Sequence, residues 1–154
     1  MFFVLKVLLA ILIIVLALAF VRSWQVENSE NQKIFAASAA PQEALDGFYS
    51  GSVNAPVKVT WLGKKFDSTA STGVNIFEDG SAGEREGYPF ATSLGINGSS
   101  TVLNIDYDQP ANPFWIRPIL DQLIETEPGK YLGKVTVRLI PSYPFSIGFF
   151  RLKK

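Results

Sequence analysis

The chain of 154 residues contains no cysteine and no histidine. Without cysteine there is no disulfide, no thiolate nucleophile and no thiolate metal ligand. Without histidine the chain lacks the commonest general base and the commonest metal ligand, which excludes histidine-dependent triads and zinc sites. Only carboxylate, lysine, tyrosine, serine and threonine side chains remain for catalysis, and we expect no metal site and no cofactor.

An excess of charge of either sign is also missing, because Lys plus Arg and Asp plus Glu both number 14. Proteins bind nucleic acids chiefly through clustered Lys and Arg side chains that neutralise phosphates. The balanced charge of this chain gives no reason to expect such a surface, so nucleic acid is not an expected partner.

The first 22 residues form one long apolar run that is interrupted before Arg22 only by Lys6. At 1.5 Å per residue, a helix of this length spans about 30 Å, the thickness of the hydrocarbon core of a bilayer. Lys6 can reach the headgroups from near the N-terminus, and Arg22 and Trp24 are typical of the other interface. Residues 1–22 therefore predict a single-pass transmembrane anchor, with the lipid bilayer as a partner.

A cleaved signal peptide is the main alternative for the same run, and a buried helix of a soluble core is another. The residues at 22–25, Arg-Ser-Trp-Gln, make a poor cleavage site, and the small residues at 36–40 lie far downstream. Because only five residues precede Lys6, a short inside tail with the domain on the extracytoplasmic side is the simpler topology.

The rest of the chain divides into a polar segment and a domain. Residues 23–44 lack a sustained apolar period and are interpreted as a linker, with a weak helix over residues 30–39. From residue 45 to residue 154, short runs of alternating apolar and polar residues are separated by turn residues, which is typical of antiparallel strands. We expect about seven strands, over residues 47–53, 57–61, 72–77, 88–96, 103–107, 135–139 and 145–152. Strands at this spacing predict a mainly β fold, a small barrel with a β-sandwich as the alternative.

Two shorter patterns refine this organisation. Asn97-Gly98 is a strong signal for a two-residue hairpin. Asn112 and Pro113 are suited to the start of a helix, and the apolar residues Ile116, Ile119, Leu120 and Leu123 that follow have helical spacing. We therefore expect a short helix after Pro113 that ends before Pro128 and packs on the sheet.

Four short motifs carry a resemblance to a known family: Gly47-x-Tyr49-x-Gly51, Trp61-x-Gly63-Lys64-x-Phe66-Asp67, Pro118-Ile119-Leu120-Asp121 and Tyr131-Leu132-Gly133-Lys134. They resemble small lipocalin-like (calycin) barrels, and in particular an uncharacterised bacterial family named for its G-x-W-x-G motif. The resemblance covers Asp46 to Leu139. The first motif has Phe48-Tyr49 where the family has tryptophan, and the apolar N-terminal run is not part of the family pattern. The family implies no catalytic residues; it implies a barrel with a pocket, and small barrels can hold one small ligand.

Aromatic residues are the first candidates for the lining of such a pocket. Ligand pockets are mostly apolar with a few polar anchors. The candidates are Trp61, Phe66, Tyr88, Phe90, Tyr107, Phe114 and Trp115. The alternative is that these aromatic side chains simply fill the core of the barrel.

Polar candidates are few. Asp106 and Asp108 share one face of a strand, and paired carboxylates can serve acid/base chemistry or bind a cation. The same residues also suit the start of a turn. Arg117 is the nearest basic residue in sequence and is expected to pair with Asp106 or Asp121. Lys64-Lys65 is interpreted as a solvated turn, with lipid headgroups as a less favoured contact.

Three functions are compatible with these patterns. The first is a membrane-tethered module that binds a small apolar or lipid-like ligand without catalysis, using Trp61, Phe66, Tyr88, Phe90, Tyr107, Trp115, Asp106 and Arg117. The second is a structural or interaction protein with a filled core that acts on a membrane partner, and the sequence does not identify any protein partner. The third is an enzyme that uses Asp106 or Asp108 with a tyrosine or lysine.

Overall fold

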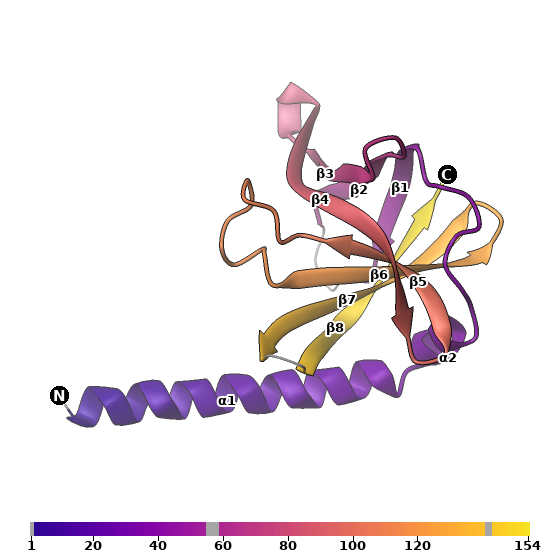
Figure 1. Ribbon diagram of the computed structural model, residues 1–154. Coiled ribbons are helices and arrows are strands. Elements are labelled where there is room, and N and C mark those ends of the chain that lie inside the picture. The colour runs from indigo at the N-terminus through magenta and orange to yellow at the C-terminus, as the bar shows by residue number, and fades with distance from the viewer. Residues whose placement is uncertain (1, 55–58, 141–142) are drawn as a thin grey trace.

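The computed structural model describes residues 2–54, 59–140 and 143–154 and has two helices and one β-barrel (Figure 1). The elements in chain order are α1 (Phe2–Glu27), α2 (Glu30–Ala36), β1 (Gly47–Val53), β2 (Trp61–Asp67), β3 (Thr72–Glu78), the short 3-10 helix η1 (Gly80–Ala82), β4 (Glu84–Asn97), β5 (Ser100–Asp106), β6 (Ile119–Glu127), β7 (Lys130–Ile140) and β8 (Tyr143–Lys153).

The eight strands form a closed antiparallel barrel in which each strand pairs with the next along the chain. The barrel closes where β1 pairs with β8, with Gly51 opposite Leu152. The predicted barrel is confirmed, and the sandwich alternative is wrong. The expected hairpin is also present, because Asn97 pairs with Ser100 across a two-residue turn in which Gly98 has a φ of 61°. That left-handed conformation favours glycine and matches the twist of the flanking strands.

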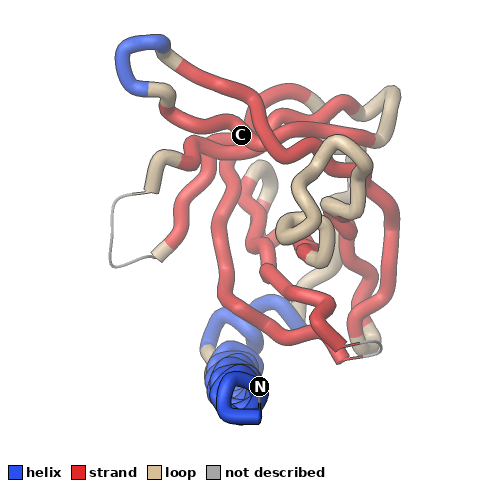
Figure 2. The backbone as a smooth tube through the Cα atoms, turned by 90° about the vertical axis from the view of Figure 1, so that its left-hand side faces the viewer, coloured by secondary structure: helices blue, strands red, loops and turns tan. Residues whose placement is uncertain are grey.

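Helix α1 has the length and composition of a membrane-spanning segment, and it is the one helix among the described residues that does. It continues five residues past Arg22 because its C-terminal turns bind the barrel. Ser23 Oγ accepts a hydrogen bond from the backbone N–H of Ser146, and Glu27 forms a 2.7 Å ion pair with Lys134. Figure 1 shows the remainder of α1 projecting beyond the barrel, and Figure 2 views this helix end-on from its N-terminus, with the barrel above it.

The barrel packs apolar residues on both sides of its wall. The interior core contains Leu45, Tyr49, Phe66, Phe90, Ile105, Tyr107, Leu123, Tyr131, Phe150 and Leu152. A second, exterior cluster lies under α2, where Phe35 is buried against Val102, Ile124 and Leu132. Helix α2 begins at the cap Ser29, whose hydroxyl accepts the backbone N–H of Gln32, so the weak helix expected in this region is present.

The helix expected after Pro113 is wrong, because the chain from Ile119 to Glu127 forms strand β6. Leu123 of this strand faces the interior core, while Ile124 packs under α2 on the outside. A strand that is covered on both faces carries apolar residues without strict alternation. In β6 the spacing of these apolar residues is the same as that of an amphipathic helix. The preceding residues 112–118 form turns.

The structure also differs from two expectations for the region of β2. The strand expected over residues 57–61 begins only at Trp61; Val59 precedes it, and Val57 lies outside the described residues. The solvated turn expected at Lys64-Lys65 is wrong, because both lysines lie within β2. The side chain of Lys65 is exposed, whereas that of Lys64 is buried inside the barrel.

Candidate functional site

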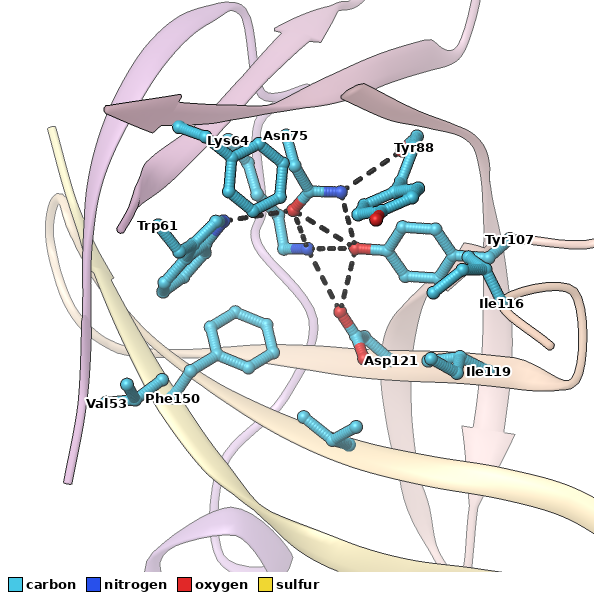
Figure 3. Close-up of a pocket in the computed structure, with 12 residues that line it drawn as sticks. Val53, Trp61, Lys64, Asn75, Tyr88, Tyr107, Ile116, Ile119, Asp121 and Phe150 are labelled. Atoms are coloured by element: carbon cyan, nitrogen blue, oxygen red, sulfur yellow. Dashed lines mark hydrogen bonds and ion pairs between the residues drawn. The ribbon is translucent and has the colours of Figure 1, made fainter. Parts of the chain in front are cut away.

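The barrel holds a cavity of about 220 Å³ close to the end at which β1, β3, β5 and β7 finish (Figure 3). Its apolar and aromatic lining consists of Val53, Trp61, Phe77, Tyr88, Tyr107, Ile116, Ile119, Val135 and Phe150. Its polar lining consists of Lys64, Asn75 and Asp121. A cavity of about 150 Å³ is enough to admit benzene in a protein core, and pockets for drug-sized molecules start near 300 Å³. The volume therefore suits one small molecule or the end of one acyl chain.

A bulge in β2 directs both Trp61 and Lys64 into the barrel. Residues three apart on a regular strand face opposite sides, but the pairing of β2 with β3 shifts between Trp61 and Gly63. Gly63 has a φ of 149°, and a Cβ atom on it would collide with the backbone oxygen of Tyr49. Only glycine fits this bulge, so the local sequence Trp-Leu-Gly-Lys sets the geometry of the site.

Lys64 is the centre of a buried polar cluster. Its ammonium lies 3.0 Å from Asp121 Oδ2 and 3.0 Å from Asn75 Oδ1, and it also donates a hydrogen bond to the hydroxyl of Tyr107. The side chains of Lys64 and Asp121 are only 3% and 5% exposed. All three N–H donors of the ammonium therefore have an acceptor, which is what a buried charge requires.

The other members of the cluster fix the acceptors in place. Trp61 Nε1 donates to Asn75 Oδ1 at 3.0 Å, and Asn75 Nδ2 donates to the backbone oxygen of Tyr88 at 3.1 Å. Tyr88 has a φ of 49°, which is uncommon for a residue with a side chain. This strained residue lines the cavity and holds the amide that orients Lys64.

Aromatic rings surround the ammonium of Lys64 on its remaining sides. The Nζ atom lies 5.0–5.6 Å from the ring centres of Trp61, Phe90, Tyr107 and Phe150. The faces of aromatic rings carry partial negative charge and attract a cation at this range. The rings therefore support the charged form of Lys64 while they exclude water.

Burial shifts the titration of all three ionisable members. It lowers the pKa of Lys64 and raises the pKa of Asp121, and the attraction between the two opposes both shifts. Burial, together with the negative charge of Asp121, raises the pKa of the Tyr107 hydroxyl well above its usual value. We assign a charged Lys64–Asp121 pair and a neutral Tyr107, because the hydrogen bonds match those states.

One acceptor of the cluster is left over. Asp121 lines the cavity, and its second oxygen, Oδ1, is buried without a hydrogen-bond partner among the described residues. A buried carboxylate oxygen without a donor is costly. A ligand N–H or O–H group that reached this oxygen would supply the missing donor.

The sequence-predicted residues divide into three sets. Trp61, Tyr88 and Tyr107 line the cavity. Phe66 and Phe90 are buried in the interior core below it, and their rings lie 5.4 Å apart in an edge-to-face contact.

The third set lies outside the barrel. Trp115 is 62% exposed and is in edge-to-face contact with Phe114, 4.9 Å away. Asp106 pairs with Arg138 at 2.7 Å, and Arg117 pairs with Asp108 at 2.6 Å rather than with the expected Asp106 or Asp121. These residues do not converge on the cavity.

Sequence reasoning missed Lys64, Asn75 and Asp121. Asp121 lay in the supposed helix, and Lys64 stood beside a second lysine that resembled a turn. The glycine of Trp61-Leu62-Gly63-Lys64 was the available signal, because an isolated glycine in a strand pattern indicates a bulge. Among the described residues there is no group of three or more His, Cys, Asp or Glu side chains that could hold a metal ion.

Stability in acid should depend on the exterior pair Asp106–Arg138. Partial burial would raise the pKa of Asp106, but hydrogen bonds from Arg138 and from the backbone N–H of Asp108, with the charge of Arg138, hold it below 3.8. A carboxyl with a lowered pKa stabilises the fold above pH 3.8, and this contribution disappears as the pH falls through the folded-state pKa.

Asp106→Asn should therefore remove a contribution of about 1 kcal/mol or less, since the pair is partly solvated. The loss should be present at pH 6 and absent once Asp106 is protonated in both states. Urea unfolding of both proteins from pH 6 downward measures it, and Arg138→Gln should reproduce the effect. A constant difference between wild type and Asp106→Asn at every pH would contradict this assignment.

Comparison with known proteins finds no matching family model, no matching curated protein and no matching solved structure. The closed barrel is compatible with a lipocalin-like fold, and the resemblance to the G-x-W-x-G family is not confirmed beyond that.

Proposed function

We propose that the chain is a membrane-tethered binding protein whose barrel holds one small, mostly apolar molecule without catalysing a reaction on it. The observation that carries the proposal is the 220 Å³ cavity, lined by apolar and aromatic side chains around one polar cluster. A small number of placed polar groups in an apolar cavity is the usual composition of a small-molecule site. The cavity favours this proposal over a structural protein with a filled core.

The tether in this proposal is α1, which would span the bilayer once, with the barrel on the extracytoplasmic side. The absence of catalysis rests on the saturation of Lys64, whose donors are all taken by Asn75, Tyr107 and Asp121. A lysine nucleophile would need a free amine.

The chemical class of the ligand follows from Asp121. The Asp121 side chain lines the cavity, and its Oδ1 is buried without a hydrogen-bond donor among the described residues. We therefore propose an apolar molecule with one hydroxyl or N–H group, of the size of a fused ring or a short lipid chain. A hydrogen bond to a charged group contributes about 1.5–3 kcal/mol, which corresponds to a preference of about tenfold or more over the same molecule without the donor.

Binding of 1-naphthol by the full chain in mild detergent tests the proposal. We expect native mass spectrometry to detect one bound 1-naphthol per chain, with naphthalene bound at least about tenfold more weakly. Val135→Trp should abolish binding, because the indole would occupy the cavity next to Asp121.

Leu94→Trp is the matched control, because it adds the same bulk at an exposed position outside the cavity. It should bind 1-naphthol like the wild type, and the detergent background is identical for all variants. Equal retention of 1-naphthol by Val135→Trp and the wild type, with the β-sheet content of both unchanged, would refute the cavity as the site.

A further inference from the structure

We propose that the end of the barrel that holds the cavity rests on the surface of the bilayer that α1 spans, so that the ligand enters the cavity from the lipid. The residues in contact with lipid would be Phe114, Trp115, Leu139, Ile140 and Tyr143. This inference rests on the membrane anchor in the proposed function and is independent of the identity of the ligand.

Helix α1 runs alongside strand β8. The ring of Phe20 lies 5.3 Å from that of Tyr143, at the start of β8. Further along α1, the side chain of Arg22 donates to the backbone oxygen of Ile147, which lies later in β8. The two elements therefore run in the same direction, and the apolar part of α1 before Phe20 continues past the beginning of β8 (Figure 1).

The beginning of β8 lies at the cavity end of the barrel. In an antiparallel barrel with sequential pairing, every second connection lies at the same end, so β7 ends where β8 begins and where β1, β3 and β5 also end. The cavity is lined by the last residue of β1, Val53, and by the first residues of β2 and β6, Trp61 and Ile119. The apolar helix thus projects from the same end at which the cavity is found.

Five exposed apolar side chains lie at this end. The connection between β5 and β6 presents Phe114, 78% exposed, and Trp115; the β7–β8 hairpin presents Leu139, Ile140 and Tyr143. Figure 1 shows the β5–β6 connection and the β7–β8 hairpin both directed toward the N-terminal side of α1. Tryptophan and tyrosine are the residues that membrane interfaces favour, because their rings combine an apolar body with a polar group.

The expected position of α1 in the bilayer also places the cavity end of the barrel at the bilayer surface. The 20 residues from Phe2 to Val21 make about 30 Å of helix, which brings the bilayer surface level with Arg22. Phe20 lies within a turn of Arg22, so its contact Tyr143 lies at the same level. The charged residues Asp106 and Asp108 near this end are each paired with an arginine at 2.6–2.7 Å, which lowers the cost of approaching the headgroups.

Single-cysteine variants of the full chain test the inference, since the chain has no cysteine of its own. Leu12→Cys, Phe114→Cys and Leu94→Cys, each carrying a nitroxide label, are reconstituted into phosphatidylcholine liposomes. Power-saturation spectroscopy then compares collisions with oxygen, which concentrates in lipid, and with a water-soluble nickel chelate. We expect the oxygen-to-nickel ratio at Phe114 to exceed that at Leu94 several-fold and to lie below that at Leu12.

Leu94 is the matched control because it is 74% exposed, close to the value of Phe114. It lies near the C-terminal end of β4, which is at the other end of the barrel from the cavity. Equal ratios at Phe114 and Leu94, with a high ratio at Leu12, would overturn the docking and leave the anchor and the ligand site intact. A low ratio at Leu12 would overturn the anchor and the docking together. Failure of 1-naphthol to bind would instead overturn the ligand site alone.

Discussion

Replacement of Asp121 by alanine is expected to lower the free energy of unfolding by about 3–5 kcal/mol, because it leaves the ammonium of Lys64 buried without its counter-charge. The side chain of Lys64 is 3% exposed, and the four rings around it exclude the water that would otherwise solvate the charge. Tyr107 would also lose the carboxylate oxygen that accepts its hydroxyl at 3.3 Å. Urea unfolding of the full chain in detergent micelles, followed by tryptophan fluorescence, measures the loss.

The neighbouring lysine supplies the control. Lys65 forms a 3.1 Å pair with Glu86 on the outside of the barrel, where both side chains are 57% exposed. Glu86→Ala should cost about 1 kcal/mol or less, since water and salt screen an exposed pair. An Asp121→Ala cost no larger than that of Glu86→Ala would contradict the charged, buried pair that we assign.

A double variant separates the two contributions to the cost. Lys64→Met combined with Asp121→Leu removes both charges and keeps apolar volume in the barrel, so it should recover most of the stability lost in Asp121→Ala. It should also lose the preference for 1-naphthol over naphthalene, because the acceptor Oδ1 is gone. These two results together would assign the Lys64–Asp121 pair to ligand recognition rather than to stability.

The strands of the barrel could be predicted because successive side chains of a strand point to opposite faces of the barrel wall, so that apolar and polar residues alternate in the sequence. In the strand predicted over residues 103–107, alternation places Leu103, Ile105 and Tyr107 on one face and Asp106 on the other. The structure confirms this: Ile105 and Tyr107 are buried in the core, and Asp106 pairs with Arg138 outside. The apolar run in α1 was equally direct, since its length matches a bilayer.

The cavity was only half predictable. Aromatic residues were predicted to line a pocket because ligand pockets are mostly apolar, and Trp61, Tyr88 and Tyr107 do line the cavity. The polar cluster was missed because Lys64-Lys65 was interpreted as a solvated turn, whereas both lysines lie in β2 and the bulge before Lys64 directs its side chain inward. Asp121 was missed because the two-sided burial of β6 has the spacing of a helix. The buried position of Lys64 becomes evident only when β2 is placed beside its partners, which lie on β3, directly after β5 and on β6.

Gly63→Ala is expected to lower the free energy of unfolding by about 3 kcal/mol or more, because the new methyl group meets main chain rather than a movable side chain. The added Cβ would collide with the backbone oxygen of Tyr49 and lie 2.9 Å from the backbone nitrogen of Gly51. Relief requires β1 and β2 to separate, which would move Trp61 and Lys64 in the cavity wall. Urea unfolding measures the loss of stability, and binding of 1-naphthol should weaken in parallel.

Gly98→Ala isolates the part of this cost that comes from backbone conformation alone. Gly98 also has a positive φ, 61°, but a Cβ on it would meet nothing within 4 Å. Its replacement should cost about 1–2 kcal/mol, the penalty of a left-handed conformation, and leave 1-naphthol binding unchanged. Similar losses for the two variants would mean that β1 and β2 can separate at Gly63 without penalty, and the bulge would then not be what holds Lys64 against Asp121.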